Sequence, residues 1–206
     1  MVSNFDFLKK DFPVLSNFGE MAEKYCYSDS NSCLMKLGMI GETIVNLMFT
    51  YDRIAFPHDN TAVARIDKLS REGLLTSDLV AILHGLRKVR NKAVHENYAS
   101  IADDKTFLPM AHSLCEWFMQ TYGDWNYSHK DFVMPEENTV SGTVDKEAEE
   151  KKESELTKLA EQMAAAAPII EQTERKKQAY KAANQRPKTE AETRFLIDEQ
   201  LRMVGW

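Results

Sequence analysis

Apolar residues recur at intervals of three and four along the first 125 positions, and this spacing limits the fold more than any other feature. In "DFPVLSNFGEMAEKYC" the apolar side chains stand at positions 14, 15, 18, 21, 22 and 25. Such spacing gathers apolar side chains on one face of an α-helix. No window shows the sustained alternation of a half-buried strand, and eight glycines and six prolines are few for a turn-rich β architecture. The predicted fold class is therefore all-α.

Five helical stretches are expected before residue 125. They cover residues 11–26, 28–54, 61–73, 75–97 and 100–123, the last with a break before Pro109. Pro57 ends the second stretch, because proline disfavours a helical conformation in the residue before it. The most apolar stretch, "LMKLGMIGETIVNLMF", carries Lys36 and Glu42, so we expect a core helix rather than a membrane span. Residues 1–125 are predicted to form a bundle of four to six helices.

The composition changes after residue 125, and three further segments are expected. Residues 126–144 are predicted to be an irregular connector, and residues 145–186 a charged helical linker interrupted at Pro168. The thin apolar seam of this linker is typical of a solvent-bridging helix or of one half of a coiled coil. The seam consists of Leu156, Leu159, Met163 and Ala167. Residues 187–206 are predicted to form an amphipathic helix that begins with a Thr189–Glu192 capping box, and the chain is expected to continue past it.

The charge balance and the cysteines exclude several classes of protein. A net charge of −6 with a pI near 5.5 excludes a protein that coats nucleic acid nonspecifically, so any such contact is local. Cys26, Cys33 and Cys115 lack metal-ligand spacing, so we expect reduced, buried thiols and no metal site. The N-terminus has no apolar run long enough for a signal peptide. These features predict a cytoplasmic protein without a membrane partner.

The stretch "LRKVRNKAVHENY", residues 86–98, crowds basic side chains onto the fourth expected helix. A local basic cluster is the electrostatic footprint of contact with nucleic-acid phosphates. The residues predicted to bind nucleic acid are Arg87, Lys88, Arg90 and Lys92. On a helix Arg90 falls on the inward, apolar face, where a charge is costly to bury unless it is paired.

The same stretch supports a catalytic interpretation that needs no metal. His95 would exchange a proton with a ribose hydroxyl or a leaving oxygen. The guanidinium of Arg90 would hold the scissile phosphate and stabilise its added charge. Asn91 would orient the histidine or contact the phosphate. Arg90, Asn91 and His95 are therefore the candidate catalytic residues.

A structural interpretation explains the same residues. Arg90 would pair with a carboxylate of another helix, either Glu42 or Glu116, and His95 would interact with the dipole at the helix C-terminus. The Arg–His spacing does not decide between the two interpretations, because the chain repeats it in "RIAFPH", residues 53–58.

The motif of Arg90, Asn91 and His95 resembles that of the HEPN superfamily of helical bundles, which is Arg, a polar residue, three variable positions and His. The longer stretch "LRKVRNKAVHENY" looks like the HEPN-like DUF4145 domain, in which RN-x-x-x-H follows L-x-x-L-R. That domain often stands at the N-terminus of the restriction (R) subunit of type I restriction–modification enzymes. The resemblance covers about residues 10–125. A second stretch, "TEAETRFLIDEQLRMVGW", is similar to the helix that opens the nuclease domain of those subunits.

These resemblances imply an N-terminal accessory domain of an R subunit, whose parent protein is an ATP-dependent DNA translocase and endonuclease. Residues 187–206 would be the first helix of a truncated nuclease domain, with Glu190, Glu192 and Glu199 as candidate acids. DNA and the methylation and specificity subunits are the expected partners. The parent protein would use ATP and Mg, but this chain has no GxxxxGK[ST] stretch and is expected to hold no cofactor itself.

Two alternatives from other classes stay open. One is a metal-independent HEPN ribonuclease that uses Arg90 and His95, in which a homodimer formed through the bundle brings two motifs together. The other is a purely structural helical module in which Arg90 is part of an ion pair.

Overall fold

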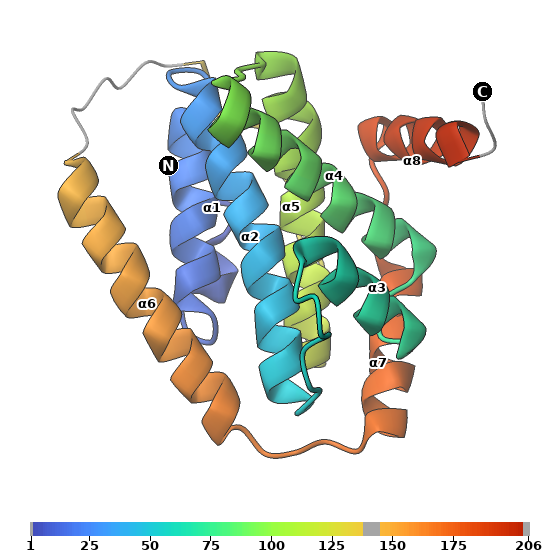
Figure 1. Ribbon diagram of the computed structural model, residues 1–206. Coiled ribbons are helices and arrows are strands. Elements are labelled where there is room, and N and C mark those ends of the chain that lie inside the picture. The colour runs from blue at the N-terminus through green and yellow to red at the C-terminus, as the bar shows by residue number, and fades with distance from the viewer. Residues whose placement is uncertain (1, 138–144, 204–206) are drawn as a thin grey trace.

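The computed structural model describes residues 2–137 and 145–203, and within those ranges the protein is all-α, as predicted. A short 3-10 turn, Asp6–Leu8, precedes the first helix. The helices are α1 (Pro13–Tyr25), α2 (Ser30–Tyr51), α3 (Ala62–Arg71), α4 (Ser77–Glu96), α5 (Ile101–Tyr122), α6 (Lys146–Ala166), α7 (Gln172–Gln185) and α8 (Glu190–Met203) (Figure 1). Each lies within a stretch predicted to be helical. Part of the predicted connector, residues 138–144, and residues 204–206 lie outside the described ranges.

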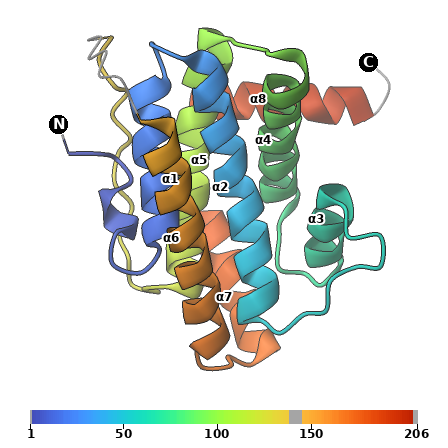
Figure 2. The ribbon, with the colours of Figure 1, turned by 60° about the vertical axis from the view of Figure 1, so that its left-hand side comes forward.

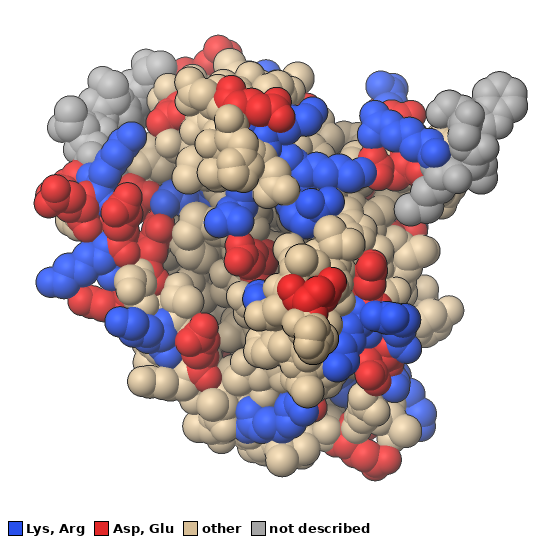
Figure 3. Space-filling model, viewed as in Figure 1, with Lys and Arg blue, Asp and Glu red and all other residues tan. Residues whose placement is uncertain are grey.

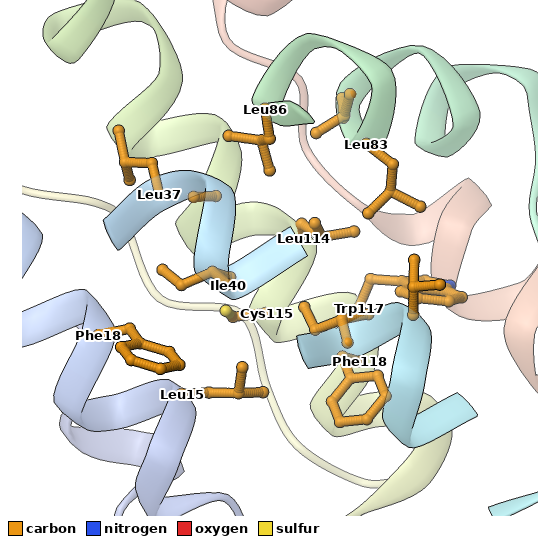
Figure 4. Close-up of a cluster of buried hydrophobic side chains, with 14 of the residues drawn as sticks. Leu15, Phe18, Leu37, Ile40, Leu83, Leu86, Leu114, Cys115, Trp117 and Phe118 are labelled. Carbon is orange, nitrogen blue, oxygen red and sulfur yellow. The ribbon is translucent and has the colours of Figure 1, made fainter. Parts of the chain in front are cut away.

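Helix α2 is the centre of the bundle and contacts α1, α4, α5 and α6. Asp29 caps its beginning by accepting a hydrogen bond from the amide of Ser32 at 3.1 Å. By length and hydropathy alone α2 could cross a membrane, but most of its apolar stretch is buried inside the bundle. Figure 4 shows Leu37 and Ile40 of α2 in one apolar cluster with side chains of α1, α4 and α5. The most apolar stretch of the sequence is therefore the core helix, as expected.

Helices α2 and α4 lie close together because α2 has glycines at their contact. A Cβ atom at Gly38 would lie 2.2 Å from the Cβ of Arg90, which is a severe clash. A Cβ atom at Gly41 would lie 3.4 Å from Leu86, which is an ordinary contact. Gly38 is therefore the position that allows the helix carrying the Arg–His motif to lie against the core.

Helix α5 runs without interruption from Ile101 to Tyr122, so the predicted break before Pro109 is wrong. Proline inside a helix costs about 3 kcal/mol, because it lacks an N–H and crowds the preceding turn. Burial offsets this cost, since every residue from 107 to 119 is buried. Tertiary packing therefore decides the conformation at this proline.

Helix α6 lies across α1 and α2, as Figure 2 shows. Lys36 of α2 pairs with Glu149 of α6 at 2.6 Å and also with Glu153. Tyr25 of α1 donates a hydrogen bond to Glu149 at 2.8 Å. This polar cluster holds the first half of a helix whose composition gave it little apolar surface to bury.

The second half of α6 packs mainly through small side chains, which corrects half of the predicted apolar seam, since Leu156 and Ala167 do pack against the core. Ala160 and Ala164 are buried, whereas Leu159 and Met163 are 43% and 38% exposed. Alanine lets α6 approach the bundle closely, and the ion pairs of Lys36 set the rotation of the helix. The larger apolar side chains consequently lie at the edge of the contact.

Helix α7 packs against α5 through a buried arginine. Arg175 pairs with Asp52 at 3.1 Å, donates to a backbone carbonyl of α5, and lies 4.2 Å from the ring centroid of Tyr122. Trp117 of α5 donates to the carbonyl of Ala179 at 3.0 Å. The described part of the charged segment is thus packed on the bundle on both sides of residue 168. The division of the whole chain into a bundle, a connector, a linker and a nuclease helix stays a prediction.

The second Arg–His spacing, residues 53–58, contributes to this packing. Arg53 has a φ of 53° and directs its guanidinium at the C-terminus of α6. It donates to the carbonyls of Ala164 at 3.2 Å and Ala165 at 2.5 Å. Carbonyls at the end of a helix lack partners within the helix, so this arginine acts as a cap.

Candidate functional site on helix α4

The Arg–His motif occupies the C-terminal half of α4, and the end of this helix is fixed by α2. Asn97 follows the helix with a φ of 50°, a left-handed conformation that asparagine tolerates at a helix end. Asn31 of α2 donates to the carbonyls of Ala93 and Tyr98 at 2.8 and 2.9 Å. These hydrogen bonds hold the motif in a defined position on the bundle.

Arg90 pairs with Glu42 of α2 at 2.8 Å, which is one of the two partners that the structural interpretation predicts. Its side chain is 35% exposed, and its aliphatic part packs against Gly38. The Nε atom of Arg90 is buried and makes no hydrogen bond to the described residues. The other predicted partner, Glu116, is engaged elsewhere, with His129.

Asn91 and His95 are exposed on the same helix. Among the described residues, no hydrogen bond or ion pair joins either of them to Arg90. Arg90 and Asn91 line a pocket between α2, α3 and α4, whereas His95 lines neither of the two hollows beside α4. The structure therefore brings the three candidate catalytic residues onto one helix but does not gather them around one point in a single chain.

The predicted basic cluster is divided between two sides of α4. Lys88 pairs with Glu199 of α8 at 2.8 Å, and the ammonium of Lys92 lies 5.2 Å from the ring centroid of Tyr98. Arg87 has no hydrogen-bond or ion-pair partner among the described residues. Figure 3 shows basic side chains along α4 and on α8, with acidic side chains among them. The cluster is a mixed surface with a local excess of positive charge.

A groove separates α4 and α5 from α8, with a volume of roughly 710 Å³. Arg87, Lys88 and Lys92 border it on α4, and Arg194 and Arg202 border it on α8. Glu199 shares the groove with these cations. Desolvation by burial raises the pKa of the Glu199 carboxyl, but the ion pairs with Lys88 and Arg202 outweigh this effect. The pKa of Glu199 is therefore lowered. This carboxylate is therefore ionised and covers part of the basic surface.

Helix α8 is anchored beside this groove by residues that the sequence did not single out. Phe195 packs over Gly85 of α4, where an added Cβ would lie 2.7 Å from its ring. The ring of Phe195 also meets that of Phe107 of α5 edge to face, with centroids 5.4 Å apart. A glycine inside a helix permits close approach by a neighbouring group, and at Gly85 that group is an aromatic ring.

A buried ion pair holds the beginning of α8. Arg186 contacts Glu192 through both of its terminal nitrogens, one at 2.8 Å, and donates to the hydroxyl of Ser113 at 2.8 Å. Both side chains of the pair are almost completely buried. Thr189 accepts a hydrogen bond from the amide of Glu192 at 3.1 Å, so half of the predicted capping box is present. The carboxylate of Glu192 faces Arg186 instead of completing the box.

The three candidate nuclease acids of α8 therefore have different surroundings. Glu192 is buried against Arg186, Glu199 pairs with Lys88, and Glu190 forms an exposed pair with Arg194 at 2.6 Å. Within residues 2–137 and 145–203, no group of three acidic, histidine or cysteine side chains is placed to hold a metal ion. The three cysteines are free and buried, as predicted.

A second cluster of titratable groups lies around Glu116, in the C-terminal half of α5. Glu116 accepts hydrogen bonds from the amide of Lys130 at 2.9 Å and from Tyr127 at 3.2 Å, and it also contacts His129. Burial raises the pKa of Glu116, and burial lowers the pKa of the neighbouring His112 to about 4. These contacts fasten the segment that follows α5 to the bundle.

Comparison with known proteins agrees with the motif-based resemblance. The sequence matches the family described as "Domain of unknown function (DUF4145)" over residues 20–162. It is similar to the type I restriction enzyme EcoKI endonuclease subunit of Escherichia coli (strain K12), with 25% identity. That match covers 99% of this chain, but the chain spans only 22% of the length of this curated relative. No solved structure matches. Because the family match extends over more than half of its residues, the chain belongs to the DUF4145 family.

Proposed function

We propose that this chain is the N-terminal accessory domain of the R subunit of a type I DNA restriction–modification system, acting in the cytoplasm. The similarity to the EcoKI endonuclease subunit carries the proposal, because it extends over 99% of the chain. It thus includes both the Arg–His stretch and the segment that resembles the start of a nuclease domain. ATP and Mg would serve the chemistry of the parent protein, and the role of this chain would be docking and contact with DNA.

The contacts of α8 support the docking role. The segment that resembles the start of the nuclease domain packs on α4 and α5 through Phe195, the Arg186–Glu192 pair and the Lys88–Glu199 pair. These contacts combine an aromatic anchor with a buried ion pair, which sets a definite orientation as well as contributing binding energy. The bundle would in this way position the nuclease domain relative to the methylation and specificity subunits.

Contact with DNA would be made by the basic side chains of α4. Arg87, Lys88 and Lys92 of α4 line the groove, and Arg87 and Arg90 extend the basic surface toward α3. Because Glu199 already pairs with Lys88, a DNA phosphate would have to compete with that carboxylate. The contact is therefore expected to be weak at physiological salt and to depend strongly on salt concentration.

Fluorescence anisotropy with a labelled DNA duplex tests this contact. The chain should bind DNA at low salt, and log K should fall linearly with log salt. In the double variant Lys88→Gln/Lys92→Gln the slope should decrease by up to about 2, because two phosphate contacts are lost. The variant Lys68→Gln, which removes a cation of α3 that pairs with a backbone carbonyl, is the matched control. An unchanged slope in the double variant, or no binding at low salt, would refute the proposed contact.

Cleavage of RNA is the competing function. It requires Arg90 and His95 to act on one phosphate, whereas Arg90 is paired with Glu42, and in the described part of the chain no hydrogen bond joins Arg90 to His95. We therefore expect that the chain does not cleave RNA in the presence of EDTA. Any residual cleavage should be the same in Arg90→Ala and His95→Ala as in the unaltered chain. Metal-independent cleavage of RNA that either substitution abolishes would favour the ribonuclease instead.

A further inference from the structure

We propose that the pocket between α2, α3 and α4 binds a phosphate monoester. This arginine pocket is lined by Arg65 of α3 and by Arg87 and Arg90 of α4, and it has a volume of about 280 Å³. It adjoins the groove beside α8, and Arg87 and Asn91 line both hollows. Arg87 and Arg90 also belong to the basic surface proposed to contact DNA, whereas Arg65 lines the pocket but not the groove.

The charges around the arginine pocket favour an anion. Three guanidinium groups line it against one carboxylate, that of Glu42, among the described residues. Glu42 engages one terminal nitrogen of Arg90 and leaves Arg87 without an anionic partner. Arg87 and Arg90 thus retain free N–H groups. Such groups suit phosphate, because its oxygens accept paired hydrogen bonds from the planar guanidinium.

Arg65 is held in place at the edge of the pocket before any ligand binds. Its Nε donates to Asn60 at 2.9 Å, and a terminal nitrogen donates to Asn46 at 2.7 Å. Its guanidinium also lies 5.0 Å from the ring centroid of Phe56. A cation that is already ordered loses little conformational entropy when an anion binds, which is the advantage of a preorganised site.

The remaining walls limit the size and the chemistry of the ligand. Val45, Ile66 and Leu83 supply apolar lining, and Asn91 also lines the pocket. The volume is near the lower end of the range of about 300–1,000 Å³ for pockets that bind small molecules. A phosphate monoester attached to one nucleoside fits both the polarity and the size. Its source would be either a free mononucleotide or the 5′-phosphorylated end of a nucleic-acid strand.

Isothermal titration calorimetry on the whole chain at low salt separates these sources. The probes are AMP, adenosine, inorganic phosphate, and a single-stranded oligonucleotide with a 5′-phosphate or a 5′-hydroxyl. Tighter binding of AMP than of adenosine supports a free nucleotide, and tighter binding of the 5′-phosphorylated strand than of its 5′-hydroxyl form supports a strand end. Arg65→Gln and Arg87→Gln should each weaken binding by about tenfold or more, because each removes a charge-assisted hydrogen bond.

Two further variants make the test specific. Glu42→Gln should strengthen binding, since it frees Arg90 and removes the one carboxylate that lines the pocket among the described residues. Lys68→Gln should leave the affinity unchanged, because Lys68 lies on α3 outside the lining of the pocket and donates to the carbonyl of Ala55. Each variant is first compared with the unaltered chain by circular dichroism and thermal unfolding without ligand.

The proposal is overturned if no phosphate monoester binds at millimolar concentration, if adenosine binds as tightly as AMP and the strand end makes no difference, or if Arg65→Gln and Arg87→Gln have no effect. The DNA duplex titration with Lys88→Gln/Lys92→Gln reports on the proposed function separately. Loss of that contact with retained binding of the monoester would refute only the contact with DNA.

Discussion

Removal of the Glu192 carboxylate is expected to detach α8 from the bundle. In Glu192→Ala the guanidinium of Arg186 stays buried beside Ser113 without its anionic partner. Breaking a buried ion pair by removing one partner costs about 3–5 kcal/mol, because an uncompensated charge remains in a region of low polarity. The loss should fall first on α8, since Arg186 and Glu192 connect that helix to α5.

A matched control lies on the same helix. Glu190 pairs with Arg194, but both side chains are exposed and four residues apart on the helix surface. Pairs of this kind contribute at most about 0.5 kcal/mol to helix stability. Glu190→Ala should therefore leave α8 in place, although it removes the same charge and the same number of atoms as Glu192→Ala.

Hydrogen exchange measured by mass spectrometry distinguishes the two variants. Peptides that cover residues 190–203 should exchange much faster in Glu192→Ala, while peptides of α2 keep their protection. Urea unfolding then gives the part of the loss that reaches the whole bundle. Equal exchange of α8 in Glu192→Ala and Glu190→Ala would refute the argument that the buried pair anchors the helix.

Three further predictions follow from the packing. Gly38→Ala should reduce the unfolding free energy by about 1–3 kcal/mol in urea titration, because its Cβ would meet Arg90, whereas Gly41→Ala should change it by less than about 1 kcal/mol. Burial raises the pKa of Asp104 from 3.8 to about 6, so the folded state holds the extra proton and its stability falls as the pH rises from 4 to 6. Asp104→Asn should abolish that fall, which amounts to up to about 3 kcal/mol, in denaturant titrations across this pH range. Arg53→Ala should cost about 1 kcal/mol and speed hydrogen exchange at the end of α6, because it removes the cap on that helix; an unaltered exchange rate there would count against the cap.

The helices could be predicted from the sequence because their apolar spacing and their caps are local signals. The spacing of the apolar residues in α2 is sufficient to predict a core helix. Asp29 marks the residue at which that helix begins. The uninterrupted course of α5 through Pro109 could not be predicted, because burial of the whole helix decides it. The placement of α6 depends on ion pairs with Lys36, which is more than a hundred residues away in the chain.

Only part of the candidate site could be predicted from the sequence. Glu42, the partner of Arg90, was one of two acids expected to pair with it, because a charge on an inward helix face needs an acid within reach. The position of Arg65 in the pocket could not be predicted, because only the fold brings α3 beside the motif helix. The catalytic role of Arg90, Asn91 and His95 stays a prediction.

The central proposal, that this chain is a module of a type I restriction complex, is tested most directly by assembly. The purified chain is mixed with the methylation and specificity subunits of its own system and with unmethylated DNA, and the products are weighed by native mass spectrometry. The proposal predicts a complex that contains the chain at a fixed stoichiometry and that weakens in Lys88→Gln/Lys92→Gln. A chain that stays free at micromolar concentration, while the full-length R subunit assembles under the same conditions, would contradict it.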